Sequence, residues 1–392
     1  MNLITSSSQL SKICQSLRAK DYVAVDTEFM RDKTYWSKLC LVQLASDGIE
    51  AVVDPLANID LEPLWELARD QSVVKVFHAG RQDVEIFYNL AKTIPLPLFD
   101  TQIAAMVCGF GDSVSYDNLV RKLTGEQIDK SSRFTDWARR PLSDQQLAYG
   151  LADVTHLRVV YKHLIQELES SKRHSWLEEE LAILTSTSTY TMSPEKAFER
   201  VKSKPKSKRA MAILMEISAW REQEAQRLNV PRNRVLKDDA LVEISSFNPQ
   251  KPADLETMRA VPRGFNHSKS AAGLLQAVER GQHRQISSVP IQVKHEALPD
   301  SLTPIVDLLR VVVKMQSKRH KVAQKLIASS DDLEQIARSD DANVAALIGW
   351  RRDLFGKMAL DIKHGRLALT VRGNQVIPIE ATQLDSASKE DD

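Results

Sequence analysis

The chain has 392 residues, of which 43% are hydrophobic and 27% charged, and its formal net charge is +1. This composition is ordinary for a globular protein and excludes collagen-like and largely disordered chains. It also excludes an integral-membrane chain, because no apolar run approaches the roughly 18 residues that a spanning helix needs. At about 150 residues per domain, the length predicts two or three domains.

The charge is unevenly distributed along the chain. Residues 1–170 carry a net charge of −5, residues 171–294 carry +7, and residues 295–392 carry −1. A basic middle region beside an acidic first region is typical of a protein whose middle contacts an anion such as nucleic acid, and whose first part holds cations or catalytic carboxylates.

The cysteines and the first residues bear on the cellular compartment. Cys14, Cys40 and Cys108 lie far apart and form no Cys-x-x-Cys pair, which is unlike a disulfide framework or a zinc site. The N-terminal segment has no basic stretch followed by an apolar block, so we expect neither a secretory signal nor a membrane partner. These features favour a reducing cytoplasm.

Residues 1–170 have an α/β pattern. Buried or half-buried strands are predicted at 21–29, 39–45, 49–54 and 73–78. The Asp47-Gly48 pair between the second and third of these predicts a hairpin, because it accepts the positive φ angles of a tight turn. Helices are predicted at 81–90, 101–107, 116–123 and from 143 or 144 to 168. Strands that alternate with helices predict one mixed sheet flanked by helices.

The long helix has a clear start signal. Ser143 can cap its first turn, and Gln146 stands at the capping-box position. A further helix is predicted at 176–184.

The remainder of the chain is predicted to be helical. Residues 171–209 read as a connecting helix and linker, whose basic run KSKPKSKR favours a solvated hinge over a dedicated RNA contact. We expect one helical domain at 210–285, a second at 295–375 with strong patterns at 304–327 and 343–358, and a polar tail at 376–392. Trp220 and Phe247 are expected in the core of the first helical domain.

Four carboxylates and one phenol stand at informative spacings in the α/β region. Asp26 and Glu28 are two apart on a strand and therefore share a face of the sheet. Asp83 follows the strand at 73–78, and Tyr149 and Asp153 are four apart on one helix face. Converging carboxylates need a compensating charge, and hard oxygen ligands select Mg²⁺ or Mn²⁺ over zinc. Two such ions can cleave a phosphodiester.

Each of these residues also has a structural interpretation, and the sequence alone does not show that they meet. Asp26 and Glu28 can be strand-end charges in solvent, and Asp83 can be a carboxylate that the helix dipole favours. Tyr149 can be a core aromatic. Asp153 is the hardest to explain in this way, because it lies within an apolar stripe and burying an unpaired carboxylate is costly.

Three sequence motifs carry a resemblance to a known family. They are VDTEF at 25–29, HAGRQDVEIF at 78–87 and YGLAD at 149–153. In this order, and with the flanking phrases FDTQIAA at 99–105 and TDWARRPLSDQQLAYGLADV at 135–154, residues 1–168 resemble the ribonuclease D family of the DEDD superfamily. Tyr149 places the resemblance in the DEDDy branch. Residues 210–281 resemble an HRDC domain, and the C-terminal segment more loosely resembles a second one.

The resemblance implies a fold and an activity. The fold is α/β, a ribonuclease-H-like mixed β-sheet flanked by helices and followed by two all-α HRDC-type domains. The activity is 3′→5′ exoribonuclease hydrolysis that releases nucleoside 5′-monophosphates. The substrate that it implies is RNA, in particular tRNA precursors with 3′ extensions, and no required protein partner is evident.

The resemblance also implies roles for the site residues. Asp26, Glu28 and Asp153 would bind a first Mg²⁺ or Mn²⁺ ion, and Asp26 would bridge to a second ion that Asp83 reaches directly or through water. Tyr149 would orient the attacking water, because a phenol with a pKa near 10 is a poor base at pH 7.

Substrate contacts are predicted less specifically. Phe29 can stack on the terminal base or belong to the core, and His78 leads the second motif but is expected to be structural. Lys130 and Arg139, with Arg133 and Arg140, lie in the loop before the third motif, where phosphate contact and a solvated surface are equally consistent. Arg232, with Arg234 and Lys237, is a candidate for backbone contacts in the HRDC-like part. Asp100 is expected to cap the helix that begins near Thr101.

Two other functions remain open from the residues alone. A 3′→5′ DNA exonuclease would share the metal site, and recognition of the ribose 2′-hydroxyl separates it from an RNA enzyme. A non-catalytic nucleic-acid-binding scaffold would keep the fold and bind through the basic middle, although the intact set of five site residues argues against it.

Overall fold

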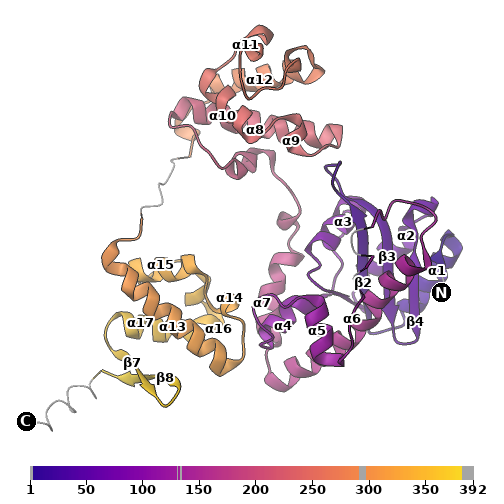
Figure 1. Cartoon of the computed structure of the whole chain (residues 1–392), viewed down its shortest axis with the longest axis vertical. Helices are drawn as coiled ribbons and strands as arrows, with labels where there is room; N and C mark the ends of the chain where they lie inside the picture. Colours follow the sequence, from indigo (N-terminus) through magenta and orange to yellow (C-terminus); the bar gives the residue numbers. More distant parts are fainter. Residues whose placement is uncertain (1–2, 130, 133–134, 291–296, 382–392) are drawn as a thin grey trace, which may run out of the picture.

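The computed structural model describes residues 3–129, 131–132, 135–290 and 297–381. Figure 1 shows three lobes around an open centre: an α/β lobe, a helical lobe and a C-terminal lobe. They correspond to the α/β region and the two helical regions that the sequence predicts.

The α/β lobe contains one mixed sheet. Its strands lie in the order β1 (Leu3–Ile4), β4 (Ile49–Val53), β3 (Lys38–Ser46), β2 (Tyr22–Met30), β5 (Val74–Phe77) and β6 (Leu98–Asp100). β2, β3 and β4 form an antiparallel meander, whereas β5 and β6 continue the sheet in parallel with β2. Gly48 has a φ of 76° at the β3–β4 turn. The predicted strands and the predicted hairpin are therefore confirmed, while the short β1 was not predicted.

Helices flank the sheet. They are α1 (Ser7–Leu17), α2 (Glu62–Arg69), α3 (Arg81–Ala91), α4 (Thr101–Val107), α5 (Tyr116–Thr124), α6 (Asp144–Ser171) and α7 (His174–Thr185). The α6 helix begins with the expected capping box, in which the Ser143 and Gln146 side chains each accept a hydrogen bond from the other's main-chain N–H. Tyr161 of α6 packs on Tyr22 of β2 with ring centroids 4.8 Å apart. Hence α6 covers the face of β2 that carries Tyr22 and, by alternation, Asp26 and Glu28.

The helical lobe has its own core. It comprises α8 (Lys208–Leu228), α9 (Arg232–Val235), α10 (Asp238–Phe247), α11 (Pro252–Glu256) and α12 (Lys269–His283). Trp220 is buried as expected, but Phe247 is 57% exposed. The expectation for Phe247 was wrong because the buried stripe of α10 runs through Leu241, Ile244 and Ser245, and Phe247 stands beside that stripe.

The C-terminal lobe differs from the expected all-helical domain. It contains α13 (Thr303–His320), α14 (Gln324–Ile327), α15 (Ser330–Arg338), α16 (Gly349–Arg351), α17 (Lys357–Lys363), β7 (Leu367–Arg372) and β8 (Gln375–Glu380). The last two strands form an antiparallel hairpin. The predicted boundary between residues 375 and 376 falls inside this hairpin, so the structured part continues beyond the expected start of the tail.

The continuous helical pattern at 304–327 is interrupted. Lys321 has a φ of 48°, and the chain then docks on the α/β lobe, where the Ala323 main-chain N–H donates to the Met106 carbonyl oxygen at 2.9 Å. Arg173 also donates to the Lys321 carbonyl oxygen at 3.0 Å. Contacts with another lobe, which sequence periodicity does not report, therefore end α13.

Both other lobes are fastened to the α/β lobe by specific contacts. Trp176 of α7 stacks on Trp350 of α16 with centroids 4.2 Å apart and planes 11° apart, and the buried core continues across this junction. At the helical lobe, the Asn229 side-chain oxygen accepts hydrogen bonds from the main-chain N–H groups of Tyr35 and Trp36, both at 3.1 Å. Tyr35 and Trp36 belong to the loop that joins β2 to β3.

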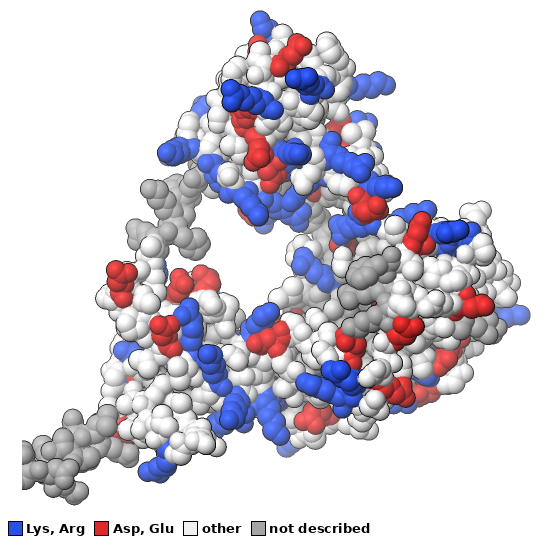
Figure 2. Space-filling model, viewed as in Figure 1, with Lys and Arg blue, Asp and Glu red and all other residues white. Residues whose placement is uncertain are grey.

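The surface is charged on all three lobes. Figure 2 shows Lys and Arg side chains gathered on the side of the helical lobe that borders the central opening. Among the described residues, no helix combines the length and the hydropathy that crossing a membrane requires.

We expect Trp350→Ala to loosen the C-terminal lobe, because it removes the stacking partner of Trp176. The free energy of unfolding should fall by about 2 kcal/mol, since an aromatic pair contributes about 0.5–1.5 kcal/mol beyond its buried area. Thermal unfolding and small-angle scattering test this expectation. Trp350→Phe should retain most of the stability, and an unchanged melting temperature and radius of gyration in Trp350→Ala would contradict the assigned junction.

Candidate active site

Three carboxylates meet at the end of β2. Asp26 and Glu28 of β2 and Asp153 of α6 each place a carboxylate oxygen within 4.8 Å of the other two. The strand alternation and the α6 packing explain this meeting, because Asp26 and Glu28 point to the face that α6 covers. Tyr149 lies one helical turn before Asp153 on α6.

The cluster lines a cavity of 510 Å³. The β2–β3 register shifts between Glu28 and Phe29, and such β-bulges redirect side chains beside functional sites. Phe29 and His78 also line this cavity. Phe29 and His78 therefore lie in the same cavity as the three carboxylates.

Asp83 approaches β2 from a different direction. It is in the first turn of α3, and its carboxylate accepts a hydrogen bond from the hydroxyl of Thr27. Thr27 alternates with Asp26 and Glu28 along β2, so Asp83 stands beside the three-carboxylate group without belonging to it. The fourth predicted acid is thus a neighbour of Asp26, and its charge raises the pKa of Asp26.

Asp100 holds α3 in this position. As expected, it caps α4, accepting from the Gln102 main-chain N–H at 2.8 Å. The same buried carboxylate accepts from the main-chain N–H groups of Ala79 at 3.1 Å and Gly80 at 2.8 Å. Because Gly80 immediately precedes α3, Asp100 ties the start of this helix to the start of α4 and so positions Asp83.

The electrostatics of the site favour a bound cation. Burial raises the pKa of Asp26 well above its ordinary value, and the charges of Asp83, Asp153 and Glu28 raise it further. Burial also raises the pKa of Asp83, to about 6. A divalent cation would remove this penalty, and an all-carboxylate donor set fits Mg²⁺ or Mn²⁺. The residues present therefore fit a divalent metal.

Tyr149 is a hydrogen-bond donor at neutral pH. Burial and the neighbouring charges of Asp153, Glu28 and Asp26 raise the pKa of its phenol, which is hydrogen-bonded to the Asp153 side chain. The group therefore keeps its proton and can orient a bound oxygen, but it cannot accept a proton from water at pH 7.

His78 is neutral at pH 7. Burial lowers its pKa to about 4, and its Nδ1 atom is 2.9 Å from the hydroxyl oxygen of Thr101. The Thr101 hydroxyl already donates to the Phe77 carbonyl oxygen at 3.0 Å. Since a hydroxyl has one proton, His78 Nδ1–H is the donor to Thr101, and Nε2 remains an acceptor.

The sequence analysis did not identify Gln43 as a residue beside the site. It pairs directly with Asp26 across the β2–β3 ladder, and its side chain is fully buried. Neither of its amide atoms has a hydrogen-bond partner within the described parts of the chain. A Cβ on Gly150 would stand 2.9 Å from Gln43 Nε2, so the glycine between Tyr149 and Leu151 makes room for this amide. A polar residue in the otherwise apolar run LCLVQLA was the available signal.

The predicted basic contacts that the structure describes do not line the acidic cavity. Lys130 and Arg133 fall outside the described residues. Arg139 and Arg232 do not line the cavity, and Arg232 instead lines a hollow beside the β2–β3 loop. Arg140 pairs with Asp54 at 2.6 Å and donates to the Cys40 carbonyl oxygen at 2.7 Å, so it stabilises the fold.

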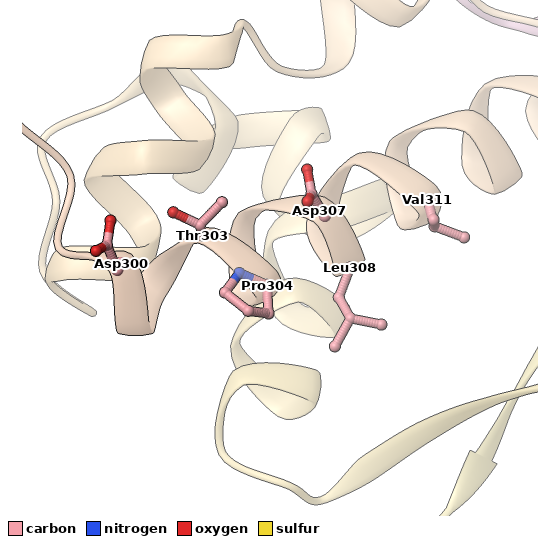
Figure 3. A pocket seen from close by; sticks show the side chains of 6 residues that line it. All are labelled: Asp300, Thr303, Pro304, Asp307, Leu308 and Val311. Atoms are coloured by element: carbon pink, nitrogen blue, oxygen red, sulfur yellow. The ribbon is translucent and has the colours of Figure 1, made fainter.

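Cavity size alone does not identify the site. A hollow of 610 Å³ on the C-terminal lobe is lined by Asp300, Thr303, Pro304, Asp307, Leu308 and Val311. Figure 3 shows these side chains spread along the first turns of α13 and, for Asp300, the segment before it, with the acids and the apolar groups pointing in different directions. They do not converge on a common point, in contrast to the carboxylates at the end of β2.

The comparison with known families agrees with the mixed sheet and with the carboxylates at the end of β2. Residues 1–169 match the family described as "3'-5' exonuclease", and residues 210–278 match the HRDC domain. A ribonuclease D from Nitrobacter hamburgensis is 48% identical over 97% of this chain and 100% of its own length. Another from Granulibacter bethesdensis is 47% identical over 95% of both chains.

A solved structure agrees with these relatives. Escherichia coli RNase D, described as an exoribonuclease involved in structured RNA processing, matches with a TM-score of 0.79 at 28% identity over 93% of this chain and 99% of its own. The chain belongs to the ribonuclease D family. It is a hydrolase, a 3′→5′ exoribonuclease whose substrate is RNA, and the DNA-exonuclease and scaffold alternatives are set aside on this ground.

We expect the metal-free protein to lose stability as the pH rises from about 4 to about 7. The folded-state pKa of Asp83, about 6, lies above its ordinary value of 3.8, so the folded state holds a proton that the unfolded chain has released. Asp83 alone should contribute about 3 kcal/mol to this loss, since one pKa unit corresponds to about 1.4 kcal/mol, and the raised pKa of Asp26 adds to it.

Urea unfolding in EDTA at several pH values measures this effect. Asp83→Asn should flatten the pH dependence, whereas Asp341→Asn, at an exposed position, should not. Added Mg²⁺ should stabilise the wild-type chain at pH 7. A wild-type chain that is equally stable across this pH range in EDTA would contradict the assigned burial.

Proposed function

We propose that Asp26, Glu28 and Asp153 hold one divalent ion, and that Asp26 and Asp83 hold a second. The proximity of the first three carboxylates supports the first ion. The proximity of Asp83 to Asp26, whose pKa its charge raises, supports the second. Mg²⁺ is the ion we propose, with Mn²⁺ as the alternative, because both prefer carboxylate oxygens.

The chemistry follows from these residues. Bound divalent ions would lower the pKa of a water and neutralise the charge that develops on the leaving 3′ oxygen. With its proton donated to Asp153, the phenol oxygen of Tyr149 accepts a hydrogen bond from the attacking water and orients it toward the terminal phosphodiester. The cavity wall at Phe29 and His78 holds the terminal nucleoside, Phe29 by stacking on its base. Hydrolysis then releases a nucleoside 5′-monophosphate.

The domain organisation supports structured RNA as the substrate class. We propose that residues 1–170 carry the chemistry and that the helical domain at 210–285 binds the body of the RNA through sequence-independent phosphate contacts. The similarity to a relative described as acting in structured RNA processing supports this division. Within that class we propose tRNA precursors with 3′ extensions as the substrate.

The cysteines support a reducing compartment. Cys14, Cys40 and Cys108 are all buried and unpaired, so none of them needs an oxidising environment. We propose that the enzyme acts in the cytoplasm, where RNA processing takes place.

The proposal depends mainly on the acidic cluster. Asp26→Ala tests whether this cluster performs the hydrolysis. Wild-type protein should shorten a 3′-extended tRNA in Mg²⁺ and release nucleoside 5′-monophosphates, and EDTA should stop the reaction. Asp26→Ala should abolish release while leaving the Kd for this RNA largely unchanged, because the helical domain is intact. A matched 3′-extended DNA should be degraded more slowly. Equal loss of hydrolysis and binding in Asp26→Ala would argue against the division between chemistry and binding.

Tyr149→Phe tests the orienting role of the phenol. Removing the hydroxyl should lower kcat about 10²-fold, the effect expected of a misplaced reacting group, with little change in KM. The pH dependence of the remaining activity should keep its shape, because a protonated phenol does not titrate in this range. A new dependence on pH would instead indicate that Tyr149 transfers a proton.

A further inference from the structure

An arginine-lined groove lies between the α/β lobe and the helical lobe. It consists of two adjoining hollows of 450 and 370 Å³, which share Arg31, Tyr35 and Arg200. Arg81 and Trp36 line the first hollow, and Arg232 lines the second. We call these six residues the arginine groove. Three separate parts of the chain build it: the β2–β3 loop with α3, the connecting segment and the start of α9.

Most of the arginine side chains in this groove have no carboxylate partner among the described residues. Within the described residues, the side chains of Arg81, Arg200 and Arg232 make no ion pair. Arg31 alone is paired, in a two-pronged contact with Glu85 at 3.0 and 2.9 Å. Glu222, which lines the second hollow, accepts a hydrogen bond from the hydroxyl of Tyr35. The groove therefore presents an excess of guanidinium groups with free donors.

The groove also offers flat aromatic surfaces. Tyr35 packs against Trp36 with ring centroids 4.7 Å apart, and Trp36 is 36% exposed although it is a large apolar side chain. Free guanidinium groups beside exposed aromatic rings are the combination that single-stranded nucleic acids require, because the cations bind phosphates and the rings stack on bases. A ligand with a single phosphate would not use the rings.

The groove begins next to the catalytic carboxylates. Arg81 precedes Asp83 by two residues in the first turn of α3. Arg31 comes directly after the end of β2, three residues beyond Glu28, which corresponds to roughly 10 Å of extended chain. The leaving 3′ oxygen belongs to the nucleotide upstream of the one removed, and we place it on the Asp83 side of the site. We therefore place the path of the upstream strand along the start of α3, where the groove begins.

We propose that the arginine groove binds the single-stranded RNA segment immediately upstream of the scissile phosphodiester, between the active site and the RNA body on the helical lobe. This inference rests on the proposed function, since it takes the 3′ end to lie in the acidic cavity. It adds a defined path, on which Arg81 and Arg200 bind consecutive parts of the phosphate backbone and Trp36 stacks on a base.

Binding in EDTA tests the groove without any hydrolysis. Fluorescence anisotropy would compare single-stranded RNA of 12 and of 4 nucleotides, each labelled at its 5′ end, on wild-type chain and on Arg81→Ala/Arg200→Ala. The Kd for the 12-mer should rise about tenfold or more, with a smaller effect on the 4-mer. The slope of log Kd against log salt should fall by about 1.4, since each lost phosphate contact on a single strand contributes about 0.7.

Two control variants separate the groove from general effects. Lys12→Ala/Arg372→Ala removes the same charge from exposed positions on α1 and β7 and should leave the salt slope unchanged. Arg81→Lys/Arg200→Lys keeps the charge and should restore most of the slope. Thermal unfolding of each variant checks the fold. Wild-type affinity and slope in a folded Arg81→Ala/Arg200→Ala chain would overturn the proposal.

Trp36 gives an independent readout. Its fluorescence should be quenched when the 12-mer binds, and Trp36→Ala should weaken 12-mer binding without changing the salt slope, because stacking releases no counterions.

In Mg²⁺, Arg81→Ala/Arg200→Ala should lower kcat/KM on the 12-mer by raising KM. If the wild-type chain released no nucleotide from any RNA, the proposed function would fail, whereas an unchanged salt slope would reject the groove alone.

Discussion

The structure depends on holding negative charges together against their own repulsion. Asp26, Glu28 and Asp153 have carboxylate oxygens within 4.8 Å of one another, and Asp83 adds a further charge close to Asp26. The sheet and the long helix α6 force this meeting, with buried packing such as that of Tyr161 on Tyr22. The stability of the whole lobe therefore offsets a local penalty, and a divalent cation can turn that penalty into binding free energy.

The same strand connects the chemistry to RNA binding. β2 carries the carboxylates, and the loop that follows it carries Tyr35 and Trp36, whose main-chain groups bind Asn229 of the helical lobe. The C-terminal lobe is fastened on α7 and α4 instead, through the Trp176–Trp350 stack and the contact between Ala323 and Met106. Figure 1 shows the resulting arrangement of lobes around the opening.

Much of the fold could be predicted from local pattern. The strand β2, the hairpin at Gly48 and the capping box at Ser143 follow from apolar periodicity and turn chemistry, which depend only on neighbouring residues. The predictions for the end of α13, the start of the tail and Phe247 were wrong. The helix α13 ends at His320 because the next residues dock on α4, and the β7–β8 hairpin replaces the start of the expected tail. Phe247 is exposed because α10 buries a neighbouring stripe.

The sequence by itself determined the types and spacing of the site residues, since two residues on a strand or four on a helix share a face whatever surrounds them. It therefore paired Asp26 with Glu28 and Tyr149 with Asp153. Only the tertiary structure decided how these pairs combine, that the Thr27 hydroxyl binds Asp83 beside them, and that the buried amide of Gln43 lies across from Asp26. The arginine groove likewise brings together Arg31, Arg81, Arg200 and Arg232 from distant segments. Packing sets the contacts between distant segments, and sequence spacing therefore does not predict them.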